Sequence, residues 1–145
     1  MNLFDLRLIS FRVMEIKGES FNTSPDENPG YAGRFQADIL SDITDIAVGG
    51  TVSARLAFMA REESEEDPFF SIAVAGHFEI MAETAIAEIT GEHGSFQIAT
   101  YLFPYLRNIA KPLLEQLGAA EVDFPLYLPP PPKASPKRTT RRKTK

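Results

Sequence analysis

The chain has no cysteine and no tryptophan, and none of its apolar runs approaches the roughly 18 residues that a membrane-spanning helix needs. The lack of cysteine excludes disulfide bonds, zinc sites built on thiolates and a cysteine nucleophile. Its first ten residues lack the basic start, apolar middle and small-residue cleavage site of a secretory signal, so we expect a cytoplasmic protein. Stability must come from burial, which a chain of 145 residues in one domain can supply.

Charge is distributed unevenly along the chain. The formal net charge is −5, but seven of the fifteen basic residues lie in the last thirteen positions. Residues 1–132 therefore carry eight basic and twenty acidic side chains, a charge of −12. Residues 129–132 are four prolines, which favour an extended spacer, and residues 133–145 contain one apolar residue. We expect a folded domain over residues 1–128 and a disordered, basic tail over residues 129–145.

Four stretches with the alternation of β-strands predict a four-stranded antiparallel sheet. They cover residues 6–21, 34–46, 51–61 and 69–81, with a tight turn at Gly49 and Gly50 and an acidic hairpin over residues 62–67. In the first strand we expect Ile9, Phe11 and Val13 on one face, and a bulge near Met14. The second face of the last strand has small or weakly polar side chains that a second subunit can cover: Ser71, Ala73, Ala75 and His77.

After the sheet the apolar period changes to that of helices. Residues 82–90 predict a short helix, and residues 95–117 a long one that begins at Ser95 and ends at Gly118. Pro104 and Pro112 lie inside this pattern, and a proline in a helix interior costs about 3 kcal/mol. We therefore expect either a kink at Pro104 or a helix that begins there.

The sequence contains no pattern typical of an enzyme, a metal site or a cofactor site. His77 and His93 are not at a metal-ligand spacing, and we interpret both as structural or exposed. The carboxylates of residues 62–67 are typical of a solvated hairpin tip rather than of acid–base catalysis. Gly49 and Gly50 lack the following Lys-Ser or Lys-Thr pattern of a phosphate-binding loop. We expect a protein that is not an enzyme and needs no cofactor.

The basic tail allows two interpretations. Its cations can contact nucleic acid or anionic lipid electrostatically, without sequence preference because the tail has no aromatic residue to stack on bases. Alternatively, the tail only adds solubility.

The part of the chain after the sheet has more apolar side chains than one helix and the loop after it need to form a core. We expect Leu102, Phe103 and Leu106 to form the core under the sheet, whereas residues 124–128, with a proline among them, cannot bury every side chain. The candidate residues for binding apolar partners are Tyr101, Tyr105, Phe124, Leu126, Tyr127 and Leu128.

The segment Tyr-Leu-Phe-Pro-Tyr-Leu-Arg at residues 101–107 resembles the helix motif of the SecB family of ATP-independent export chaperones. Residues 124–129, Phe-Pro-Leu-Tyr-Leu-Pro, resemble the apolar loop after that family's long helix. Weaker matches occur on the first and fourth strands, at Phe11, Val13, Ile16, Phe21, Gly76 and Phe78. The similarity covers about residues 8–129, and only the Phe-Pro-Tyr motif is specific.

The resemblance implies an α+β fold: a four-stranded antiparallel sheet backed by one long helix and assembled as a dimer of dimers. It also implies a cytoplasmic holdase whose hydrophobic grooves bind unfolded polypeptides, preproteins for export among them. Burial of apolar surface makes no directional demands, so it suits a binder of many sequences. The implied partners are unfolded clients, further copies of the chain and the translocase ATPase.

Three features depart from the family pattern. Prolines follow the apolar loop where the family has a second helix, and the tail is basic where family members often end in acidic residues. The carboxylates that dock the translocase ATPase are replaced by Asn22 and Ser71, with Glu19 the one nearby match. These departures leave two alternatives open: a SecB-like chaperone that protects the antitoxin of a toxin–antitoxin system, and a nucleic-acid-associated accessory protein acting through the tail.

Overall fold

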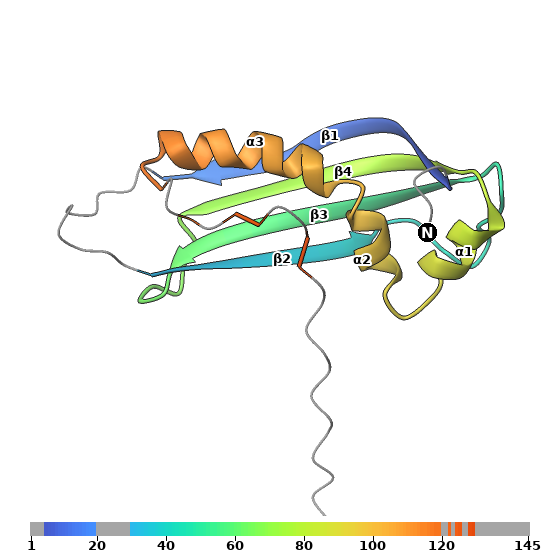
Figure 1. The fold of residues 1–145 in the computed structure, drawn as a ribbon, viewed down its shortest axis with the longest axis horizontal. Coiled ribbons are helices and arrows are strands. Elements are labelled where there is room, and N and C mark those ends of the chain that lie inside the picture. Colours follow the sequence, from blue (N-terminus) through green and yellow to red (C-terminus); the bar gives the residue numbers. More distant parts are fainter. Residues whose placement is uncertain (1–4, 20–29, 120–121, 123, 126–127, 130–145) are drawn as a thin grey trace, which may run out of the picture.

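The computed structural model describes residues 5–19, 30–119, 122, 124–125 and 128–129. Helices on one side back a four-stranded antiparallel sheet, which confirms the predicted α+β architecture (Figure 1). The strands are β1 (Leu6–Gly18), β2 (Tyr31–Ile39), β3 (Thr51–Glu62) and β4 (Phe70–Ile80), in the spatial order β1-β4-β3-β2. The helices are α1 (Glu83–Ile89), α2 (Gly94–Ala99) and α3 (Phe103–Gln116). None of these described helices has the length and apolar content needed to cross a membrane.

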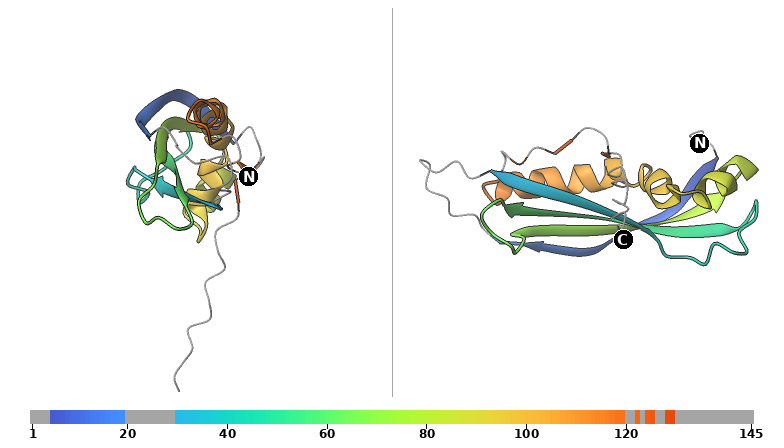
Figure 2. Two further views of the ribbon diagram at one scale, coloured as in Figure 1. Left: turned by 90° about the vertical axis from the view of Figure 1, so that its left-hand side faces the viewer. Right: turned by 90° about the horizontal axis from the view of Figure 1, so that it is seen from below.

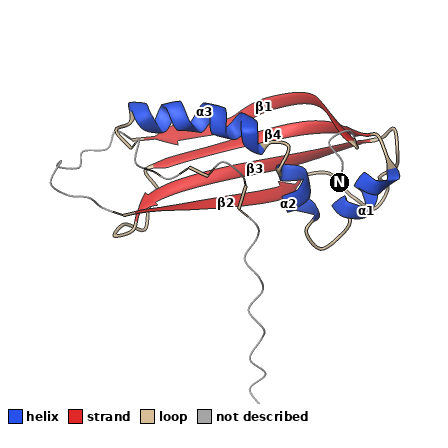
Figure 3. Ribbon diagram, viewed as in Figure 1, coloured by secondary structure: helices blue, strands red, loops and turns tan. Residues whose placement is uncertain are grey.

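All three helices lie on the same side of the sheet, and we call the face of the sheet on that side the inner face (Figures 2 and 3). Pairing between the strands decides which side chains point to it. Phe78 of β4 lies opposite Val52 of β3, and Val74 lies opposite Leu56, so the apolar alternation predicted for both strands falls on the inner face. The small residues of β4, such as Ala73 and Ala75, point to the opposite, outer face, as predicted.

Strand β1 departs from regular pairing at two places. The register shifts between Val13 and Glu15, which confirms the bulge predicted near Met14. It also shifts between Leu8 and Ser10, so Ile9 has no partner on β4 and is 51% exposed. The expectation that Ile9 shares a face with Phe11 and Val13 is therefore wrong, because each bulge inserts a residue that reverses the alternation beyond it.

The second strand begins earlier and ends earlier than predicted, because side chains compete with the ladder after Ile39. The Asp42 carboxylate accepts hydrogen bonds from the Thr44 N–H at 3.0 Å and from the Thr44 hydroxyl at 2.7 Å, which lowers the pKa of Asp42. Residues 40–50 form the connection to β3. The predicted glycine turn is at its end, where Gly49 has φ of 87° and the Gly50 N–H donates to a carbonyl at 2.9 Å.

The long helix expected over residues 95–117 is wrong: α2 and α3 are separate helices. Pro104 lies in the first turn of α3, where a missing N–H costs no intrahelical bond, so the alternative that a helix begins there is the right one. Ser95 is not a cap, since α2 begins at Gly94 and has no side-chain cap. Gly118 ends α3 as predicted, with φ of 82° and with its own N–H and that of the next residue bonded to carbonyls of the last turn.

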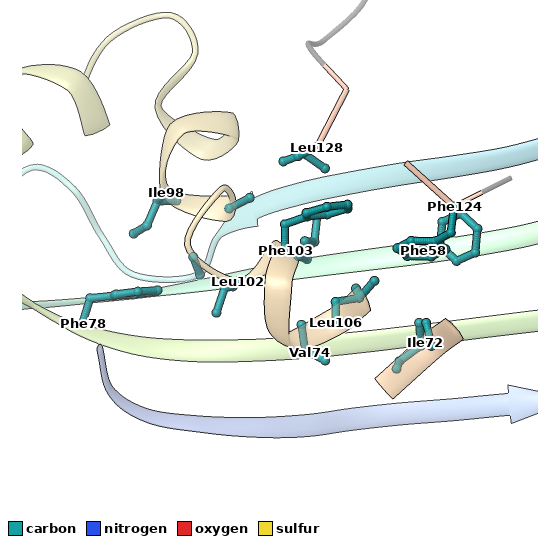
Figure 4. Packing of buried hydrophobic residues seen from close by; sticks show 14 of the residues in the cluster. Phe58, Ile72, Val74, Phe78, Ile98, Leu102, Phe103, Leu106, Phe124 and Leu128 are labelled. Atoms are coloured by element: carbon teal, nitrogen blue, oxygen red, sulfur yellow. The ribbon is translucent and has the colours of Figure 1, made fainter. Parts of the chain in front are cut away.

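The core lies between the inner face and the helices. Leu102, Phe103 and Leu106, which the sequence predicts as core, are at most 3% exposed (Figure 4). The chain approaches the sheet closely at the start of α3, where a Cβ atom at Gly76 would lie 2.5 Å from Leu102 Cδ2. The absence of a side chain at Gly76 of β4 thus allows the contact with Leu102 that holds the start of α3 against the sheet.

Candidate functional site

A cluster of four phenylalanines lies on the inner face over β2 and β3. Phe124, which follows α3, lies with its ring centroid 4.8 Å from that of Phe58, 5.7 Å from Phe35 and 5.9 Å from Phe103 (Figure 4). Phe124 is only 9% exposed, as is Leu128. Residues after α3 therefore cover an aromatic surface that β2, β3 and α3 form together.

Two tyrosines lie near β1 and β4. Tyr101 contacts Phe78 of β4, with ring centroids 6.0 Å apart, and Tyr105 contacts Phe11 of β1 at 5.0 Å. Burial raises the pKa of Tyr101, and the carboxylates of Asp5 and Glu88 raise it further, so its phenol is neutral at physiological pH. Tyr105 remains 45% exposed and presents an aromatic surface to the solvent.

The predicted client-binding residues are thus divided between two locations. Tyr101 and Tyr105 lie toward β1 and β4, whereas Phe124 and Leu128 lie in the cover over β2 and β3. Leu126 and Tyr127 are outside the described residues. Phe124 and Leu128 are buried, so in this structure their side chains cover the aromatic surface beneath them.

The Phe-Pro-Tyr motif performs three different structural tasks. Phe103 is buried, Pro104 begins α3, and Tyr105 points to the exposed edge of the core. The motif's arginine, Arg107, has a buried Nε without a hydrogen-bond partner among the described atoms. A buried donor of this kind is costly unless a further group accepts from it.

Strand β1, at the edge of the sheet, has exposed apolar side chains at its two bulges and on the inner face, an exposure that sequence reasoning did not identify. Its side chains are unusually exposed for their type: Ile9 51%, Val13 40%, Met14 45% and Ile16 46%. β1 pairs with β4 on one side, and no described strand pairs with it on the other. An unpaired edge with apolar side chains is a template for association with another strand. The sequence signal was the apolar content of β1, of which the prediction placed Ile9, Phe11 and Val13 on one face, with one bulge near Met14.

The two histidines, the acidic run and the possible metal ligands can be placed within the part of the chain that the structure describes. His77 Nδ1 lies 2.7 Å from Ser53 Oγ on the outer face, but no described acidic group orients the imidazole, as a nucleophile–base pair requires. His93 is exposed before α2. Residues 63–69 connect β3 and β4, which confirms a hairpin at the acidic run that begins with the last residue of β3. Among the residues that the structure describes, no three His, Cys, Asp or Glu side chains are placed to hold a metal ion.

Comparison with known proteins identifies the fold. No protein-family model and no curated protein matches the sequence. The structure is similar to that of the SecB-like chaperone Rv1957 of Mycobacterium tuberculosis, solved in complex with a ChAD peptide from the HigA1 antitoxin. The TM-score is 0.56 at 11% sequence identity, over 84% of this chain and 90% of that chain. The chain therefore has a SecB-like fold, which confirms the resemblance drawn from its sequence motif.

Proposed function

We propose that this protein is a SecB-like chaperone that holds unfolded polypeptides without ATP. The observation that carries the proposal is the shared fold with a chaperone that was solved with a bound peptide. The exposed aromatic and aliphatic side chains beside its core support the same function, because apolar burial contributes roughly 25 cal/mol per Å² without directional demands. We propose that its clients include preproteins for export and that it binds them in the cytoplasm.

Client segments bind on both sides of α3. Toward β1, Tyr101 and Tyr105 supply aromatic surface that is already partly exposed. Over β2 and β3, residues 124–128 act as a displaceable cover, and Phe124 exchanges its contacts with Phe58 and Phe103 for contacts with the client. Leu126, Tyr127 and Leu128 extend this second surface. Backbone hydrogen bonds to an extended client add affinity without selecting its sequence.

Assembly follows from the edge of β1. Two copies that pair through β1 about a two-fold axis cover each other's Val13, Met14 and Ile16 and continue the sheet across the interface. We propose a homo-oligomer, a dimer of dimers, in which the partner also supplies an acceptor for the Arg107 Nε. This assembly leaves the outer face of each sheet accessible.

The holdase proposal predicts that the protein suppresses aggregation of a reduced, unfolded model client at near-stoichiometric concentration in the absence of ATP. Light scattering reports the aggregation, and a folded protein of similar charge serves as the control. Aggregation that is unchanged over a roughly tenfold range of protein concentration would refute the proposal.

A second candidate function is protection of an antitoxin, which the peptide bound to Rv1957 favours. The two functions differ in their clients, since export requires many preproteins and protection requires one antitoxin. Identification of the proteins bound to this chain in its own cells therefore separates them. Docking to the translocase ATPase is expected only with the export function. The basic tail, which would serve a nucleic-acid-associated function, lies outside the described residues.

A further inference from the structure

The outer face of the sheet concentrates the positive charge of the folded domain. Strand register places six basic side chains on it, with three acidic ones, Glu15, Asp38 and Glu79. The basic set is Arg7, Arg12, Lys17, Arg34, Arg55 and Arg61. Residues 1–132 contain only eight basic residues in all, against twenty acidic ones. One face thus has a charge of +3, while the rest of this region has two basic and seventeen acidic residues.

Part of this positive charge has no acidic partner on the face. The three carboxylates form ion pairs with Arg7, Lys17 and Arg55, the last two at N–O distances of 2.9 and 3.7 Å. Arg12 and Arg34 form no ion pair with a described residue. Arg61 is fixed differently, because its Nη1 donates to backbone carbonyls of the β3–β4 hairpin at 3.0–3.3 Å. Three arginines therefore remain in excess over the carboxylates of the face.

Two of these arginines line a hollow at the hairpin end of the sheet. The hollow has a volume of about 450 Å³, within the usual range for ligand sites. Its lining residues are Ala32, Gly33, Arg34, Met59, Arg61, Glu66 and Pro68. Guanidinium groups bind carboxylates with two parallel hydrogen bonds, and Met59 and Pro68 add apolar surface to the same lining. The lining therefore suits an acidic side chain with an apolar neighbour.

We propose that the outer face is a docking surface for an acidic polypeptide segment, held by Arg12, Arg34 and Arg61. This surface is separate from the client-binding surfaces, which lie across the sheet on the inner face. The chain's own basic tail cannot occupy it, since the two have the same sign of charge.

The size of the patch favours a short peptide over nucleic acid. Strands lie about 4.8 Å apart, so the four strands of the sheet extend roughly 15 Å across. A long polyanion extends beyond this patch after a few residues and then lies against the surrounding acidic surface. The two are repelled there, because charges interact over about 8 Å at physiological ionic strength. Glu66 at the hollow adds to the repulsion of closely spaced phosphates. A peptide in which carboxylates alternate with apolar residues remains on the patch.

The test uses the full chain and a fluorescein-labelled acidic peptide of about 12 residues, in which Glu alternates with Leu, read by fluorescence anisotropy at low salt. Arg34→Glu is compared with Lys111→Glu, an exposed substitution on α3 with the same change in charge. We expect Arg34→Glu to weaken binding about tenfold and Lys111→Glu less than about twofold, with the tail contributing equally in both. Arg12→Glu repeats the test on β1, and thermal melting checks that each variant folds.

Any of the following four outcomes would overturn the proposal. Equal losses in Arg34→Glu and Lys111→Glu show that binding follows net charge or the tail. Binding of a peptide with Gln in place of Glu as tightly as the acidic one shows that carboxylates are not recognised. Tighter binding of a single-stranded oligonucleotide, with the same dependence on Arg34, assigns the face to nucleic acid. A protein mass that falls in Arg34→Glu without peptide assigns the face to contacts between copies of this chain.

Discussion

Phe103→Ala is expected to lower the free energy of unfolding by about 3–5 kcal/mol, whereas Tyr105→Ala, two residues away, lowers it by less than about 1 kcal/mol. Phe103 is 3% exposed and packs against Phe35 and Phe124, so its removal leaves a cavity in the core. Tyr105 is 45% exposed, so truncation leaves little empty space. Urea unfolding, followed by far-ultraviolet circular dichroism, measures both changes.

Tyr105, whose truncation has the smaller effect on stability, is expected to contribute more to client affinity than Phe103. Tyr105→Ala is expected to weaken binding of an unfolded client about fivefold, while Tyr105→Phe, which keeps the ring, preserves it. Equal losses of stability in Phe103→Ala and Tyr105→Ala would show that Tyr105 is ordinary core, and the assignment of a client surface beside β1 would be wrong.

Ile16→Glu is expected to reduce the mass of the assembly. Ile16 is 46% exposed on the edge of β1, and pairing of two copies through that edge brings both side chains into an apolar interface. In that interface the introduced carboxylate loses its water and lies near the same carboxylate of the second copy. The two effects together cost several kcal/mol of association free energy. Multi-angle light scattering should give the wild type four times the 16.1 kDa of one chain, and the variant a smaller multiple.

Val48→Glu is the matched control, because Val48 is 48% exposed in the connection between β2 and β3, away from the edge of β1. It introduces the same charge and should leave the mass unchanged. A wild-type mass of 16.1 kDa at micromolar concentration, or equal effects of the two substitutions, would contradict assembly through β1.

The sheet was predictable because its signals are local. Alternation of Val52, Ala54, Leu56 and Phe58 on β3 needs no information from other parts of the chain, and the register confirms its face. Likewise, Gly118 marks a helix end through its own backbone conformation. The Phe-Pro-Tyr motif around Pro104 is likewise a short, contiguous signal, and it indicated the SecB-like fold that the structure has.

The errors arose where the outcome depends on contacts between distant or competing groups. Ile9 was assigned to the wrong face because a bulge inverts alternation without changing composition. The second strand ended early because the Asp42 side chain bonds its own backbone neighbourhood. The positive charge of the outer face could not be predicted from the sequence either. Its six basic residues come from three strands and lie together only in the folded sheet.

The arrangement of the candidate binding residues could not be predicted from the sequence. Aromatic content beyond the needs of one helix indicated apolar binding surfaces near Tyr105 and Phe124. Their separation by α3, and the burial of Phe124 against Phe58, depend on how the chain returns over β2 and β3 after α3 ends. Spacing along the sequence contains no information about that path.

Binding of a permanently unfolded polypeptide tests the central claim most directly. A reduced and alkylated protein, labelled with a fluorophore, is titrated with the full chain without nucleotide, and its native, disulfide-bonded form is the control. We predict saturable binding of the unfolded form in the micromolar range or tighter, with Tyr105→Ala weaker than the wild type, and no binding of the native form. Equal binding of both forms, or of neither, would contradict the proposal that this protein is a holdase.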